Sequence, residues 1–155
     1  GRTAERELRQ AVSAVGAGAI VLDLRANRGG DFERMLRVAG LLTGPTKHAL
    51  SVIGKDGRRL RAIPATGPIA GVHSLTVVVG GETASSAEML AALLRRHAGA
   101  EVVGERTRGK DTLVRVIPVH HDWRLVLPAE RVEIAGEDLA GGLRPDRAAP
   151  DLAPR

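Results

Sequence analysis

Two short stretches of this chain are apolar at almost every position, at residues 19–24 and 74–79. Uninterrupted apolar runs of this length are typical of strands that are buried on both faces, as in a parallel sheet. The two runs therefore predict two buried strands, and the first is expected to belong to a parallel sheet.

Other stretches repeat apolar residues every three or four positions, which is the period of a helix. The first helix is expected over about 4–16, with Thr3 as its N-cap. The second begins after Asp31, which is expected to cap it, and ends near Leu42. The third covers about 85–97. Helix, strand, loop and helix in this order predict an α/β layered core.

The remaining elements are expected to be strands. Residues 47–53 and 58–63 flank Gly-Lys-Asp-Gly, a turn sequence that predicts a hairpin over 46–64. Four more strands are expected, at 101–103, 112–119, 124–127 and 131–134. The tail from Asp138 is rich in glycine, proline and charged residues, which predicts an irregular segment.

Composition narrows the kinds of partner that the chain can have. Its 155 residues, 43% of them apolar, suit one globular domain with its own core. The net charge of +5 suggests nucleic acid, but only Phe32 and Trp123 are aromatic. Platforms for base stacking are therefore missing, and no nucleic-acid partner is expected. No apolar run reaches the roughly 18 residues of a membrane-spanning helix, so no span is expected either.

Ser85 and Lys110 stand in two short contexts that suit nucleophilic catalysis. Ser85 lies in Glu-Thr-Ala-Ser-Ser-Ala-Glu, where a predicted strand gives way to a helix, and Lys110 ends Gly-Glu-Arg-Thr-Arg-Gly-Lys. A serine hydroxyl becomes a nucleophile when a base takes its proton, and a desolvated neutral lysine can be that base. The alternative is that Ser85 only caps the helix, with Glu88 completing a capping box. The two interpretations are compatible.

Gly29 and Gly30 close the loop between the first predicted strand and the second helix. They fit either a turn that needs positive φ or a place where a backbone N–H faces a reacting carbonyl. The residues alone do not decide between these roles.

Two further patterns suggest ligand sites. Residues 104–110 match most of a phosphate-binding loop, but Asp111 stands where Ser or Thr should hold magnesium, and a β-rich segment follows instead of a helix. His120, His121 and Asp122 suggest a metal site, yet adjacent residues of a strand point to opposite faces. A solvated turn is expected there, and neither a metal nor a cofactor is expected in this chain.

Taken together, these segments resemble the C-terminal processing peptidases, which are tail-specific serine endopeptidases with a serine–lysine dyad. Residues 23–30 are similar to the family's Asp-Leu-Arg-Asn-Asn-Pro-Gly-Gly element, and residues 83–88 are similar to its Ser-Ala-Ser-Ala-Ser-Glu element. Residues 104–110 are similar to Gly-Glu-x-Thr-Phe-Gly-Lys, and residues 142–146 to Gly-Ile-x-Pro-Asp. The elements come in the family's order, and the resemblance covers nearly all of 4–151. The interval of 25 residues between Ser85 and Lys110 also agrees with the family.

The resemblance implies a ClpP/crotonase-like α/β core, with sheets flanked by helices, and a mechanism. Ser85 would attack a peptide carbonyl, and Lys110 would take and return the proton through an acyl-enzyme intermediate. A backbone N–H near Gly29 or Gly30 and that of Ser86 would hold the oxyanion. Lys110 would have to be neutral near pH 7, so its burial is expected.

The resemblance also implies partners and a location. Family substrates are apolar C-terminal tails of exported proteins, often presented by a PDZ domain, so a periplasmic or otherwise exported protein is expected. The chain shows neither a PDZ sequence nor the family's strand before the first helix. We therefore expect 1–155 to be a single protease-core domain, with any PDZ or other regulatory domain elsewhere in a longer protein.

Departures from the family pattern leave a second hypothesis open. Val114 stands where the family has a glutamine that is thought to orient the lysine. Thr112 would share a strand face with Lys110 and is a candidate to replace the glutamine. Asp111 replaces a glycine and is a candidate to keep Lys110 charged. The alternative is a catalytically inactive member of the same fold that acts as a binding or scaffold module.

Overall fold

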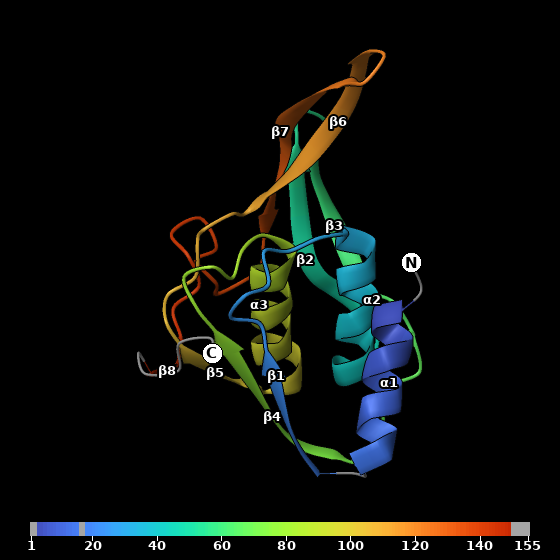
Figure 1. Ribbon diagram of the computed structural model, residues 1–155, viewed down its shortest axis with the longest axis vertical. Coiled ribbons are helices and arrows are strands. Elements are labelled where there is room, and N and C mark those ends of the chain that lie inside the picture. The colour runs from blue at the N-terminus through green and yellow to red at the C-terminus, as the bar shows by residue number, and fades with distance from the viewer. Residues whose placement is uncertain (1–2, 16–17, 150–155) are drawn as a thin grey trace.

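A parallel sheet of four strands contains both of the apolar runs. The computed structural model describes residues 3–15 and 18–149. In spatial order the strands of this sheet are β1 (Gly18–Asp23), β4 (Val72–Val79), β5 (Glu101–Gly104) and β8 (Arg147–Ala148). All neighbours are parallel, which confirms the prediction for residues 19–24. The carboxyl ends of β1 and β4 lie side by side, so the loops that follow them meet (Figure 1).

Three helices cover the sheets: α1 (Thr3–Val15), α2 (Phe32–Thr43) and α3 (Ser86–Ala98). Asp31 caps α2 as predicted, because its carboxylate accepts a hydrogen bond from the Arg34 N–H at 2.7 Å. Thr3, which was predicted to be the N-cap of α1, is instead the first residue of that helix, and the residue before it lies outside the described residues. No helix within residues 3–15 and 18–149 is long and apolar enough to cross a membrane.

An antiparallel sheet forms the other half of the fold. Its strands, in spatial order, are β3 (Gly57–Ile63), β2 (Thr46–Gly54), β7 (Trp123–Glu133) and β6 (Thr112–His120). The hairpin predicted over 46–64 is confirmed. The two strands predicted at 124–127 and 131–134 are instead one strand, β7. Pro128 does not interrupt it. Pro128 pairs with Val114 and Glu130 pairs with Leu113, so Ala129 of β7 is an extra residue that forms a bulge next to the proline.

Strands β6 and β7 extend far beyond the rest of their sheet as a two-stranded ribbon (Figure 1). Strand β2 pairs with β7 only at Arg131, Val132 and Glu133. Residues 113–130, which we call the ribbon, therefore pair only with each other among the described residues.

The core lies around α3, which is buried along most of its length. Leu, Val, Ala, Ile and Met side chains fill it, as the scarcity of aromatics requires. Strand β8 is an element that the sequence did not predict. Asp146, just before it, fixes its place by accepting a hydrogen bond from the Val102 N–H of β5 at 2.8 Å.

Candidate active site

Ser85 stands at the point where the loop after β4 enters α3. It is the N-cap of the helix, as predicted, but its backbone has φ 56° and ψ −125°. A positive φ is unusual for a residue with a side chain and indicates that the surroundings impose it. The loop is anchored by buried Thr83, whose hydroxyl donates to the Leu24 carbonyl at 2.8 Å and accepts from the Gly80 N–H at 2.9 Å. Ser85 itself is partly exposed.

Glu88 connects the serine segment to the lysine segment. Its side chain is fully buried, at 0% exposure. One carboxylate oxygen accepts hydrogen bonds from the backbone N–H groups of Ser85, at 2.7 Å, and Lys110, at 2.8 Å. The other accepts from the Gly109 N–H at 2.7 Å and from the Thr107 hydroxyl at 2.5 Å. Four donors thus satisfy a carboxylate that would otherwise be costly to bury.

Local sequence patterns predicted only part of this role of Glu88. The capping-box pattern indicated only its contact with Ser85, which the structure confirms. The other donors lie 19 to 22 positions away along the chain. No local pattern indicates contacts at that distance.

The lysine segment is braced from a second side. The Arg108 N–H donates to the Thr83 carbonyl at 3.0 Å, so the two candidate segments are also joined backbone to backbone. Thr107 and Leu143 exchange two hydrogen bonds: Thr107 N–H to the Leu143 carbonyl at 3.1 Å, and Leu143 N–H to the Thr107 hydroxyl at 2.7 Å. The lysine backbone is therefore fixed on both sides.

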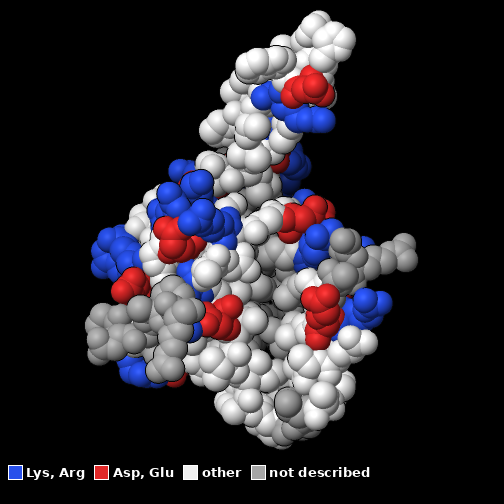
Figure 2. Space-filling view, viewed as in Figure 1, with Lys and Arg blue, Asp and Glu red and all other residues white. Residues whose placement is uncertain are grey.

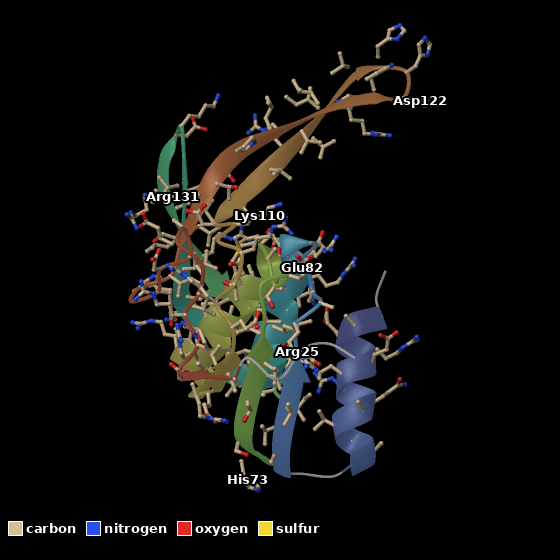
Figure 3. The ribbon with its side chains drawn as sticks, turned by 60° about the vertical axis from the view of Figure 1, so that its left-hand side comes forward. Arg25, His73, Glu82, Lys110, Asp122 and Arg131 are labelled. Carbon is tan, nitrogen blue, oxygen red and sulfur yellow. The ribbon has the colours of Figure 1, made fainter. Side chains whose placement is uncertain are left out.

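The Lys110 side chain is exposed, so the expected burial is wrong for the structure described here. Lys110 lies at the base of the ribbon, near Glu82 of the loop before Ser85 (Figure 3). It lies two residues before the first residue of β6, the edge strand of its sheet, where its side chain is open to solvent. Within residues 3–15 and 18–149, Lys110 makes neither an ion pair with Asp111 nor a hydrogen bond to the Ser85 hydroxyl.

Gly29 packs directly against the serine. Its φ is 95°, and a Cβ added there would lie 2.7 Å from the Ala84 carbonyl oxygen, 2.9 Å from the Ser85 Cβ and 3.0 Å from the Ser86 nitrogen. The turn is held further by the Ala84 N–H, which donates to the Asn27 carbonyl at 3.1 Å. Only glycine fits this close approach.

The candidate oxyanion donors differ in availability. The Gly29 N–H already donates to the Asn27 side-chain oxygen at 2.9 Å. The N–H groups of Gly30 and Ser86 have no protein partner within the described part of the chain. The Ser86 hydroxyl donates to the Gly30 carbonyl at 3.0 Å and so holds these two residues together.

A pocket of about 320 Å³ opens beside Gly29, Gly30 and Ser86. Apolar side chains from β1 and all three helices line most of it: Ala4, Leu8, Leu22, Leu24, Met35, Val38, Ala87 and Leu90. A side chain of a bound peptide next to the reacting carbonyl can enter such a pocket.

Thr112 and Val114 contribute less than expected. The Thr112 hydroxyl makes no hydrogen bond to any residue within 3–15 and 18–149. The Val114 side chain is 57% exposed and turned to solvent.

An ion pair marks the carboxyl end of β1, next to the glycine turn. The Arg25 guanidinium donates to both Asp23 carboxylate oxygens, with a shortest distance of 2.6 Å. These hydrogen bonds lower the pKa of Asp23 against the opposing effect of desolvation, and they raise the pKa of Arg25. Both residues belong to the Asp-Leu-Arg sequence, but no role for them was predicted.

The two alternative ligand sites have ordinary structural explanations. Residues 105–111 lead into strand β6, whereas a phosphate-binding loop opens a helix. His120 and His121 are exposed at the tip of the ribbon, where the chain turns, as expected.

Comparison with known proteins identifies a family. A family model described as peptidase family S41 matches residues 2–149. The chain is 32% identical over 158 residues to carboxyl-terminal-processing peptidase 2 of the Arabidopsis thaliana chloroplast, covering 99% of this chain and 30% of that protein. It is 32% identical over 114 residues to the carboxy-terminal processing protease CtpA of Bacillus subtilis, covering 72% and 24%. The chain therefore spans about a quarter to a third of the length of these relatives.

Solved structures show the same fold. A photosystem II D1 C-terminal processing protease superposes with a TM-score of 0.78 at 27% identity, covering 96% of this chain and 39% of that chain. A putative S41 protease from Bacteroides fragilis superposes with a TM-score of 0.80 at 18% identity, covering 97% and 43%. The predicted fold class and the resemblance to C-terminal processing peptidases are both confirmed.

Proposed function

Because the chain belongs to peptidase family S41, we propose that it is the catalytic core of a serine endopeptidase that cleaves unfolded or C-terminal segments of proteins. Ser85 is the nucleophile and Lys110 the general base. The observation that carries this assignment is the buried carboxylate of Glu88, which binds the backbone N–H groups of both residues. A link of this kind holds two distant segments in one constellation, as a dyad requires.

The proposed reaction has two halves. The Ser85 Oγ attacks a peptide carbonyl while its proton passes to the Lys110 Nζ. The N–H groups of Ser86 and Gly30, which have no protein partner among residues 3–15 and 18–149, support the developing oxyanion. The intermediate collapses as the amine leaves with the lysine proton. Water, deprotonated by Lys110, then attacks the acyl ester and releases Ser85.

Exposure of Lys110 sets a condition on this mechanism. A lysine works as a base near neutral pH when its surroundings disfavour the ammonium form. The Lys110 backbone is fixed by Glu88, so only its side chain has to reorient toward Ser85. A bound peptide covering this surface, or another part of a longer protein, would supply the missing desolvation.

The pocket beside Gly30 and Ser86 supports an apolar residue next to the scissile bond. Apolar tails of exported proteins, presented by a PDZ domain of a longer protein, are the proposed substrates. Two relatives are named as chloroplastic and others are bacterial, in keeping with an exported location.

The test uses the full-length protein that contains this chain and an unfolded protein as substrate. Ser85→Ala and Lys110→Ala are each expected to reduce cleavage to background, whereas Lys55→Ala, in the exposed β2–β3 turn, is expected to retain it. Circular dichroism checks that every variant is folded. A folded wild-type protein that cleaves no more than its Ser85→Ala variant would contradict the proposal and leave the binding or scaffold module.

A further inference from the structure

The two proposed oxyanion donors come from segments that lie 56 positions apart in the sequence. The Ser86 N–H belongs to the first turn of α3, which is buried along most of its length and holds this donor rigidly. The Gly30 N–H belongs to the loop between β1 and α2. Oxyanion donors are effective when they are already in place as the charge develops. Gly30 therefore has to be held in position relative to Ser86.

The Gly30 N–H lies on the peptide plane between two glycines. Such a plane turns easily, because neither of the residues that it joins has a Cβ to restrict φ and ψ. Gly29 is confined by its close contacts with Ala84 and Ser85. At Gly30, by contrast, nothing lies within 4 Å of the position that a Cβ would take. Packing around Gly30 thus does not fix the direction of its N–H.

A hydrogen bond from Ser86 supplies the missing restraint. The Ser86 hydroxyl donates to the Gly30 carbonyl at 3.0 Å, and within residues 3–15 and 18–149 the Gly30 backbone makes no other hydrogen bond to protein. Ser86 is only 5% exposed, so water has little access to compete for this bond. One residue thus offers the first oxyanion donor, its own N–H, and restrains the residue that carries the second.

The glycine loop also lacks a restraint that the family element carries. In Asp-Leu-Arg-Asn-Asn-Pro-Gly-Gly a proline, whose φ is fixed, precedes the two glycines, whereas Arg28 stands at that position here. In Ser-Ala-Ser-Ala-Ser-Glu an alanine stands at the position of Ser86. A freer glycine loop and an added hydroxyl group therefore occur together in this chain.

The Arg28 side chain does little to replace the proline. It pairs with Glu82 at 2.5 Å, but the two side chains are 74% and 50% exposed. Figure 2 shows acidic and basic side chains mixed in the same way over the body of the molecule below the ribbon. Exposed ion pairs contribute little to stability. The restraint on Gly30 is therefore assigned to the buried hydroxyl of Ser86.

We propose that Ser86 is a positioning residue: its hydroxyl holds Gly30 so that the N–H groups of Gly30 and Ser86 point at the same oxygen atom. This inference rests on the proposed peptidase function. The Ser86 hydroxyl itself exchanges no proton with the substrate. Because the oxyanion develops only as the serine attacks, loss of this hydroxyl should slow the chemical step and leave binding of the intact substrate unchanged.

The first test measures kcat and KM of the full-length protein that contains this chain, with a fluorescein-labelled unfolded protein as substrate. For Ser86→Ala we expect kcat to fall by about tenfold to a hundredfold, less than for loss of a whole oxyanion donor, and KM to stay within about twofold. The control is Thr43→Val, at the opposite end of α2 from Gly30. It also removes a hydroxyl that donates to a backbone carbonyl, that of Ala39 at 3.1 Å, and should keep the wild-type kcat.

A second test needs no substrate. In protein labelled with ¹⁵N-glycine, the Gly30 amide signal is identified by its absence from a Gly30→Ala variant. Relaxation measurements should give the Gly30 amide an order parameter of about 0.85 in the wild type and below about 0.6 in Ser86→Ala. Thr43→Val should retain the wild-type value.

Three results would overturn the inference and leave the proposed function standing. They are a kcat for Ser86→Ala within about twofold of wild type while Ser85→Ala is inactive, an equal fall in kcat for Thr43→Val, and a Gly30 amide that is as ordered in Ser86→Ala as in the wild type. A folded wild-type protein that cleaves no more than Ser85→Ala would instead overturn the proposed function, and this inference with it.

Discussion

At the scale of single residues, Gly29 and Gly30 test how tightly the loop after β1 is packed against the serine. Alanine at 29 would need a positive φ and would place its Cβ within 3 Å of the Ala84 oxygen and the Ser85 Cβ. We expect Gly29→Ala to lower the free energy of unfolding by about 2 kcal/mol or more. Nothing lies within 4 Å of a Cβ added at Gly30, so Gly30→Ala should change the free energy of unfolding by less than about 1 kcal/mol.

Chemical denaturation of the two alanine variants measures both values. Equal losses for Gly29→Ala and Gly30→Ala would show that the close approach to Ser85 is not what holds the turn.

The sequence predicted the local conformation at the candidate site better than it predicted the surroundings of its residues. Ser85 as an N-cap and the glycine turn beside it follow from local patterns, because caps and turns depend on neighbouring residues. Whether Lys110 is buried depends on what packs over it, and the residues near it in sequence do not fix that. For the same reason only one of the four donors to Glu88 was foreseen.

At the scale of elements, α3 and the lysine segment depend on each other through Glu88. Glu88→Gln keeps the size of the side chain but directs an NH₂ group at backbone N–H donors in a buried place. Because hydrogen bonds to a charged group contribute about 1.5–3 kcal/mol each, we expect a loss of about 3 kcal/mol in the free energy of unfolding.

The control for this prediction is Glu105→Gln, since Glu105 is exposed and its side chain has no hydrogen-bond partner within residues 3–15 and 18–149. Urea denaturation of both variants provides the comparison. If Glu88→Gln were no less stable than Glu105→Gln, the four hydrogen bonds would not be holding the segments together.

Most elements were predictable because their patterns are local. The strand expected at 19–24 is observed as Gly18–Asp23, and the helix expected over 85–97 as Ser86–Ala98. Two departures have tertiary causes. Strand β7 continues through Pro128 with a bulge at Ala129, and the two residues of β8 are a strand only because β5 offers an edge.

At the scale of the whole molecule, stability should be uneven. The body is built around fully buried residues such as Val77 and Leu94, whereas every residue of the ribbon from 114 to 129 is exposed. We expect backbone amides of α3 and β4 to exchange with deuterium only when the whole molecule unfolds. Amides of residues 114–127 should exchange at least about a hundredfold faster.

Hydrogen exchange read by mass spectrometry on peptides from the two regions checks this expectation. Equal protection of the ribbon and α3 in the dilute protein would mean that another surface covers the ribbon.

Ser85 also limits how this chain can change over time. Its backbone conformation is one that glycine adopts more easily than serine, so the position favours a residue with no side chain at all. Two of the six serine codons, AGU and AGC, differ from a glycine codon by a single base, so the relaxing substitution is open to a chain that uses one of them. A lineage selected only for a stable scaffold would therefore drift toward glycine here, and a serine in this place marks a chain that gives up some stability to keep a hydroxyl group.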